Sequence, residues 1–357
     1  MRAAAAAAGL LALTTVAGTR VPTPRMLHTA GHDRIAAFAE DGGMVAWLGA
    51  GGGCNSVRVL TGDGSQVTSP QPTGGSMTCH WDLEGERPQL AVAGGAAAVL
   101  WTLSQESGAS FDYVMTAGLG GREVRLDRIA HASDGTGLWL GGVAGSGTTL
   151  AYSVVDLEYA DELACLAGQS CRRRIAGGGV HVVSDGQQHL LPDSRPALSL
   201  STADGRLAYV PAVAGPAGPT ASARLPVSIV DASTGEAVTS VRPHGKPLAL
   251  SLSPDVLALL TRSGRTDRVS WYDATVGTLL GSVRVSRRVA PELAASDRLV
   301  VFRFGRRLRG IDLATGRIRT LARAASKPLG FSLTDARLTW AENRPAGGRI
   351  RIVGVGS

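Results

Sequence analysis

The sequence SIVDASTGEA at residues 228–237 returns twice in altered form, as WYDATVGTLL at 271–280 and as GIDLATGRIR at 310–319. Each copy has apolar residues in alternation, then an aspartate, then a glycine four positions later. The aspartates, Asp231, Asp273 and Asp312, are 42 and 39 residues apart (273 − 231 and 312 − 273). A spacing this regular predicts a repeated structural unit.

The unit at 246–285 indicates what the repeated phrase does. It holds four short runs with alternating or continuous apolar character, separated by turn residues such as Ser-Pro-Asp and Ser-Gly. Such runs predict strands joined by tight turns. The third run ends near the aspartate, whose carboxylate can accept backbone N–H bonds two residues on, and a glycine with positive φ then closes the hairpin into the fourth run. These glycines are Gly235, Gly277 and Gly316.

Comparable units fill the rest of the chain, giving seven at 32–74, 89–127, 128–193, 196–245, 246–285, 290–324 and 326–355. The last unit has only three strands, and the isolated VPTPRMLH at 21–28 can supply the fourth and close a ring. We therefore predict an all-β fold, a seven-bladed β-propeller of four-stranded antiparallel blades closed by the N-terminal strand. Eight blades result if 128–193 divides. A β-sandwich is not expected to repeat at this period, and no helical period supports a βαβ fold.

The pattern apolar-x-x-Asp-x-x-Thr-Gly, carried by Asp231/Gly235, Asp273/Gly277 and Asp312/Gly316, resembles the repeat of the bacterial quinoprotein-like and YVTN-like β-propellers. The resemblance is clear over residues 196–324 and implies radial four-stranded blades. It does not extend to quinoprotein chemistry. Those enzymes have a Trp docking pattern in each blade and often an adjacent cysteine pair, whereas the six Trp here are not in register and no two cysteines are adjacent.

The amino terminus, MRAAAAAAGLLALTTVAGTR, has the pattern of a secretory signal peptide. Arg2 is a minimal positive region, residues 3–17 are uncharged, and Thr15-Val16-Ala17 is a small-x-small cleavage site. We assign residues 1–18 to the signal peptide and 19–357 to one propeller domain. No other segment is long and apolar enough for a transmembrane helix. We therefore expect a secreted or cell-envelope-associated protein on the extracellular side.

Four cysteines are compatible with an exported chain. They form two sequence-local pairs, Cys54 with Cys79 and Cys165 with Cys171. Three connectivities are possible, and we expect the local one. A metal site is the competing interpretation, but no Cys-x-x-Cys pair is present and the two pairs lie far apart.

The formal net charge is +7, and 34 of the 36 basic residues are Arg, because Lys occurs only at Lys246 and Lys327. Many basic residues follow position 260, and a group at Arg303, Arg306, Arg307 and Arg309 is a candidate patch for an anionic partner. The alternative is compositional, since a GC-rich genome encodes Arg where another encodes Lys. We expect no specific nucleic-acid recognition.

No motif of catalysis is complete. The Gly-rich 49–56 lacks the Gly-Lys-Ser/Thr of a phosphate loop, and 74–78 misses the last Gly of a serine-hydrolase elbow. The seven His are scattered, so we predict no metal site. The densest acidic cluster is Asp156, Glu158, Asp161 and Glu162, which could hold a cation or a basic partner or could be a solvated loop. We predict no catalytic residue and no cofactor.

Together these patterns predict an exported, monomeric β-propeller that is a non-enzymatic scaffold for a protein or an envelope polymer. The stretches at 49–56, 142–148, 156–176 and 211–221 are expected to vary its binding surface. The alternative is a propeller enzyme, such as a lyase or glycan hydrolase, with acidic and His side chains converging at the mouth of the central channel. A third possibility is an Arg-mediated binder of an anionic polymer.

Overall fold

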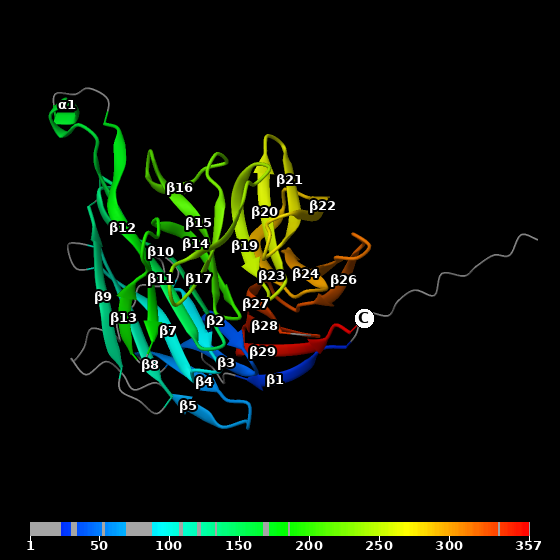
Figure 1. Cartoon of the computed structure of the whole chain (residues 1–357). Coiled ribbons are helices and arrows are strands. Elements are labelled where there is room, and N and C mark those ends of the chain that lie inside the picture. Colours follow the sequence, from blue (N-terminus) through cyan, green and yellow to red (C-terminus); the bar gives the residue numbers. More distant parts are fainter. Residues whose placement is uncertain are drawn as a thin grey trace, which may run out of the picture.

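The computed structural model describes residues 23–29, 34–51, 54–68, 88–106, 110–119, 123–132, 134–166, 171–184, 186–334 and 336–356. These residues form seven antiparallel blades around an axis, which confirms the predicted seven-bladed β-propeller (Figure 1). Blades 2 and 3 are joined into one sheet by a single pairing of Gly137 with His131. The unit predicted at 128–193 supplies one blade, β10–β13, and its first residues, Arg128–His131, instead pair with β8 of blade 2.

Apart from the strand that closes the ring, the strands of each blade follow one another in the chain from the innermost strand outward. Blade 1 contains β2 (Arg34–Asp41), β3 (Met44–Gly51), β4 (Cys54–Leu60) and β5 (Gln66–Thr68). Blade 2 contains β6 (Leu90–Ala93), β7 (Ala98–Glu106), β8 (Ser110–Gly118) and β9 (Val124–His131). Blade 3 contains β10 (Gly137–Ser146), β11 (Thr149–Tyr159), β12 (Arg173–Ser184) and β13 (Gln187–Leu190), with the short helix α1 (Glu162–Leu166) between β11 and β12.

The remaining blades are more regular. Blade 4 contains β14 (Ala197–Ala203), β15 (Arg206–Gly215), β17 (Val227–Asp231) and β18 (Ala237–Val241), and β16 (Gly218–Ala221) pairs with the end of β15. Blade 5 contains β19 (Lys246–Leu252), β20 (Val256–Ser263), β21 (Thr266–Asp273) and β22 (Leu279–Val285). Blade 6 contains β23 (Val289–Ala295), β24 (Leu299–Phe304), β25 (Arg307–Asp312) and β26 (Ile318–Arg323). Blade 7 contains β27 (Pro328–Thr334), β28 (Arg337–Arg344) and β29 (Gly347–Gly354).

The ring closes through the N-terminal strand β1 (Arg25–Thr29), which is the outermost strand of blade 7. It pairs antiparallel with β29, with Met26 opposite Arg351, and a guanidinium nitrogen of Arg351 also donates to the carbonyl of Pro24 at 3.1 Å. The predicted exchange of a strand between the first and last parts of the chain is therefore confirmed.

Apolar packing between blades holds the ring together. One hydrophobic cluster fills each of the seven gaps between neighbouring blades; for example, Leu250 and Leu257 of blade 5 pack with Val210 and Ile229 of blade 4. Each blade is therefore covered on both faces. This accounts for second strands such as β20, which are almost continuously apolar and buried rather than alternating.

Inner-strand serines add a repeated polar link between blades. The hydroxyl of Ser201 accepts a hydrogen bond from the N–H of Leu252 at 2.9 Å, and that of Ser251 accepts one from the N–H of Ala295 at 2.9 Å. The hydroxyl of Ser332 donates to the carbonyl of Glu40 at 3.1 Å, which links blade 7 to blade 1. Each innermost strand also contacts the innermost strand of the next blade, so the seven together surround a central channel.

Two faces of the disc follow from this connectivity. The turn face carries the connections from first to second and from third to fourth strands of each blade. The loop face carries the connections from second to third strands and those between blades. No helix in the described part of the chain is long and apolar enough to cross a membrane.

Candidate functional site

The repeated Asp–Gly phrase forms hairpins on the turn face. Asp231, Asp273 and Asp312 each end the third strand of their blade, and Gly235, Gly277 and Gly316 have φ of 80°, 75° and 68°. In blade 5 the carboxylate of Asp273 accepts the N–H groups of Thr275 at 2.8 Å and Val276 at 2.9 Å. These residues are therefore engaged in turn formation.

The same hydrogen bonds stabilise the ionised carboxylates. The Ser233 hydroxyl, followed by the backbone N–H of Thr234, lowers the pKa of Asp231 to about 2. The hydroxyl of Thr315 likewise lowers the pKa of Asp312. A lowered pKa here reports a satisfied turn, because the donors belong to the same four-residue loop.

A long arm projects from the loop face of blade 3 (Figure 1). We define the arm as residues 156–176, of which 167–170 lie outside the described part of the chain. It comprises the outer end of the β11–β12 hairpin and α1. A disulfide joins Cys165 to Cys171, with a Cα–Cα distance of 4.6 Å. The predicted partner of Cys54, Cys79, and the side chain of Cys54 itself lie outside the described residues.

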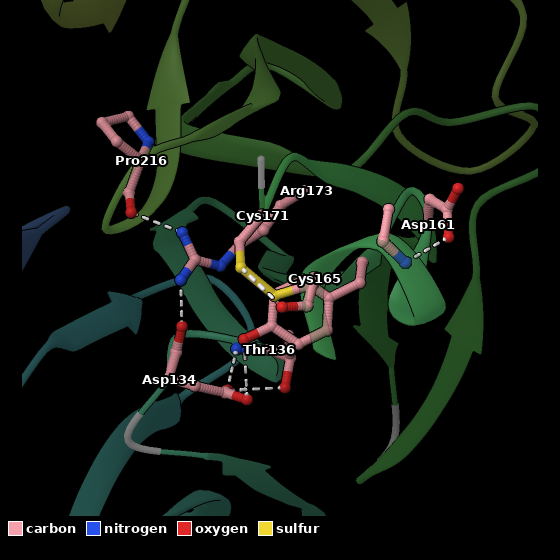
Figure 2. The surroundings of a disulfide bond; sticks show 9 residues. Asp134, Thr136, Asp161, Cys165, Cys171, Arg173 and Pro216 are labelled. Carbon is pink, nitrogen blue, oxygen red and sulfur yellow. Dashed lines mark hydrogen bonds between the residues drawn. A yellow bond between two sulfur atoms is a disulfide. The ribbon is translucent and has the colours of Figure 1, made fainter. Parts of the chain in front are cut away.

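Arg173 braces the base of the arm (Figure 2). Its guanidinium donates to the carbonyl of Asp134, in the connection between blades 2 and 3, and to the carbonyl of Pro216, in the β15–β16 turn of blade 4. It also lies over the ring of Tyr159, 5.8 Å from the centroid, and the hydroxyl of Tyr159 donates to the Asp134 carboxylate at 3.0 Å. One side chain thus links three loop-face segments.

Two of the four acids in the cluster at the arm make local contacts. Glu158 pairs with Arg174 at 2.5 Å, and the carboxylate of Asp161 accepts the N–H of Ala164 at 2.9 Å. No group of three or more potential metal ligands occurs among the residues that the structure describes.

The predicted variable stretches divide between the two faces. The stretches 49–56, 156–176 and 211–221 include second-to-third-strand connections and lie on the loop face. The stretch 142–148 is instead the end of β10 and its turn into β11, on the turn face, so it does not contribute to the same surface.

The four arginines predicted as one patch are separated by the structure. Arg303 is only 4% exposed, and its guanidinium makes two hydrogen bonds to the Glu292 carboxylate, at 2.9 and 2.8 Å. Its place in that patch is therefore a wrong prediction, because a buried, paired guanidinium cannot meet a partner. Arg306 and Arg307 are exposed on the loop face, and Arg309 is half-buried in β25.

The central channel encloses about 380 Å³ and is lined by residues of all seven innermost segments, including Phe38, Gln89, Val143, Leu248 and Phe331. Glu292 is the one ionisable residue in the described wall, and its partner Arg303 belongs to the same blade. Gln89 contributes polar contacts, donating to the carbonyl of Gly141 at 2.9 Å and accepting the N–H of Val143 at 3.1 Å. Neither Glu292 nor Gln89 was predicted from the sequence, because each contacts residues of another strand.

No protein-family model and no curated protein matches this chain. Among solved structures, a chain of the crystal structure of the mitotic checkpoint complex aligns over 99% of this chain and 99% of its own, with a TM-score of 0.56 and 14% identity. The WD40 β-propeller domain of Doa1 aligns over 93% of this chain and 96% of its own, with a TM-score of 0.47 and 9% identity. BamB from Moraxella catarrhalis aligns over 89% of this chain and 85% of its own, with a TM-score of 0.44 and 12% identity. At 14% identity the first likeness shows the fold alone, so the quinoprotein-like and YVTN-like resemblance stays a prediction.

Proposed function

We propose that this chain is an exported, monomeric β-propeller that acts as a binding scaffold, and that its loop face recognises an anionic polymer of the cell envelope. The observation that carries the proposal is the sorting of charge between the two faces of blades 5–7. Exposed basic residues gather on their loop face: Lys246, Arg265, Arg284, Arg287, Arg288, Arg306, Arg307, Arg323, Lys327 and Arg344.

The carboxylates at the loop-face side of these blades are already engaged. Asp267 is buried and forms an ion pair with Arg262 at 2.8 Å, and Glu292 pairs with Arg303. Glu342 is 1% exposed and accepts the N–H groups of Ala325 and Ser326 at 2.8 and 3.2 Å. Within the described part of blades 5–7, none of these acids therefore offsets the exposed cations.

Composition alone does not account for this distribution. A genome that encodes Arg in place of Lys would raise the number of arginines on both faces alike. The exposed acids in the described part of blades 5–7 are Asp255 and Asp297, and both instead lie at turns of the opposite face, as do the half-buried Asp273 and Asp312. A positive face of this kind attracts polyanions, and the attraction weakens as salt screens it.

The test is retention on immobilised heparin, used as a polyanion probe, over a series of NaCl concentrations. We expect binding whose affinity falls linearly on a log–log plot of affinity against salt. Replacing Arg298 and Arg317 on the turn face with Gln should leave that plot unchanged. Retention that is absent, or equal from low to high salt, would remove the proposal. Intact mass of the exported protein tests the predicted removal of residues 1–18.

A second candidate, protein docking, is favoured by the tip of the arm. Leu163 and Leu166 of α1 are 80% and 77% exposed, beside a disulfide that restricts the tip. Large apolar side chains exposed on a projection of this kind fit a pocket on a partner protein. A photo-crosslinking residue at Leu163 should give a discrete protein adduct in the envelope fraction, whereas one at Val276, 62% exposed on the turn face, should not.

A further inference from the structure

Four basic residues occupy one equivalent position in four consecutive blades. In blades 5, 6, 7 and 1 the pairing of the first and second strands shifts register near the start of the first strand, after Pro247, Val289, Pro328 and Ile35. The residue that precedes each of these four in the chain is basic and exposed: Lys246, Arg288, Lys327 and Arg34. We call these four residues the crescent.

The crescent lies at the loop-face mouth of the central channel. Its members begin, or directly precede, the innermost strands β19, β23, β27 and β2, which surround the axis. Leu248, Leu329 and Phe38, a few residues further along three of these strands, line the channel itself. These four cations are therefore nearer the axis than those on the second-to-third-strand turns, such as Arg265 and Arg306.

No described carboxylate pairs with the crescent. Among these cations, Lys246 has a hydrogen bond to an uncharged group, since its Nζ donates to the Thr220 hydroxyl at 2.7 Å. The described carboxylates on the loop-face side of blades 5–7 are bound by Arg262, by Arg303 and by backbone N–H groups. Like charges gathered at one opening repel one another, and a bound anion relieves that repulsion.

We infer that the crescent is a phosphate-binding site through which the propeller binds the anionic polymer. This inference rests on the proposed function. Its cations come from the starts of the innermost strands of four consecutive blades, so they lie around part of the channel mouth. A tetrahedral phosphate accepts donors from several directions, whereas a carboxylate accepts them mainly in its own plane. Arg34 and Arg288 supply planar forks that match phosphate oxygens, and Lys246 and Lys327 supply point charges.

The experiment uses inorganic tripolyphosphate as the probe, with affinity measured by calorimetry on the full exported chain. Replacing all four crescent residues with Gln should weaken tripolyphosphate binding about 100-fold, because every direct phosphate contact is lost. The matched control replaces Arg265, Arg306, Arg307 and Arg344 with Gln, which removes the same four charges from outer turns. It should stay within about threefold of the wild type, and unchanged melting temperatures confirm folding.

Each alternative outcome is decisive. If the control variant loses tripolyphosphate binding and the crescent variant keeps it, the site is on the outer turns and the inference is overturned. Citrate bound as tightly as tripolyphosphate overturns the assignment to phosphate. Salt-sensitive heparin retention by the wild type without tripolyphosphate binding leaves the proposed function intact and removes only the crescent. Absence of heparin retention removes the proposed function itself.

Discussion

On the turn face of blades 4–6, Asp231, Asp273 and Asp312 each accept N–H or hydroxyl groups of their own hairpin. On the loop face of blades 5–7, exposed cations such as Arg265 and Lys327 have no comparable role in closing a turn. The acids of one face are thus explained by backbone geometry, whereas the cations of the other are not. A charged side chain that the fold does not need is the better candidate for recognition.

The largest expected change in stability comes from comparing a buried cation with an exposed cation on the loop-face side. Replacing Glu292 with Gln leaves Arg303 buried without its counter-charge and should lower the free energy of unfolding by about 3 kcal/mol. Replacing the exposed Arg265 with Gln should change it by less than about 0.5 kcal/mol. Chemical denaturation measures both. Equal, small losses would show that Arg303 is no more structural than the surface cations.

The turn face offers a matched pair of glycines. A Cβ at Gly277 would lie 2.8 Å from the Thr239 hydroxyl, whereas a Cβ at Gly316 would meet nothing within 4 Å. Positive φ alone costs alanine about 1 kcal/mol, which is the loss expected for Gly316→Ala. Gly277→Ala should cost about twice as much because the neighbouring blade must also shift. Identical thermal shifts for the two variants would contradict this.

The turn carboxylates also predict a pH dependence. The pKa of Asp231 falls from its ordinary 3.8 to about 2 in the folded chain. Its contribution to stability is therefore fully present above pH 3.8 and is lost as the pH falls through about 2. Asp231→Asn should lower the melting temperature by roughly 2 °C at pH 5. The two proteins should converge near pH 2, and a constant difference would argue against the ionised turn.

The smallest global effect is expected at the arm. Arg173→Gln removes the contacts to Asp134 and Pro216 but leaves the blades untouched, so the melting temperature should stay within about 1 °C. Limited proteolysis should nevertheless cut the arm about tenfold faster, because local opening no longer breaks those contacts. Arg172→Gln, an exposed neighbour, is the control. Equal cleavage rates would show that Arg173 does not brace the arm.

Local chemistry explains which parts of the fold could be predicted from sequence. The Asp–Gly hairpins depend on residues within one short segment, so the pattern alone identifies them. The boundary between blades 2 and 3, in contrast, was not predicted correctly from the sequence. RIAHASDG at 128–135 resembles the start of an inner strand, yet Arg128–His131 pairs with β8 and completes blade 2. Pairing with a distant strand, rather than the local pattern, decides that assignment.

The site could be predicted only in part for the same reason. Arg303 looks like its exposed neighbours in sequence, and its burial depends on Glu292 in the adjacent strand. The crescent was missed because its members are single residues in separate repeats. The signal was present, since Lys246-Pro247-Leu248 and Lys327-Pro328-Leu329 repeat a basic residue before the inner strand. Alignment of the repeats by their strand registers reveals it.

The seam between β1 and β29 has a consequence for biogenesis. Met26 and Arg351 are partners 325 positions apart (351 − 26), so the first described strand of the chain must wait for nearly all the rest. Contacts this distant form late, since the intervening chain must first be ordered. If residues 1–18 direct export from the amino end, as we predict, β1 would cross the membrane long before β29. The pairing that closes the ring could then form only after the carboxyl-terminal strand had also crossed.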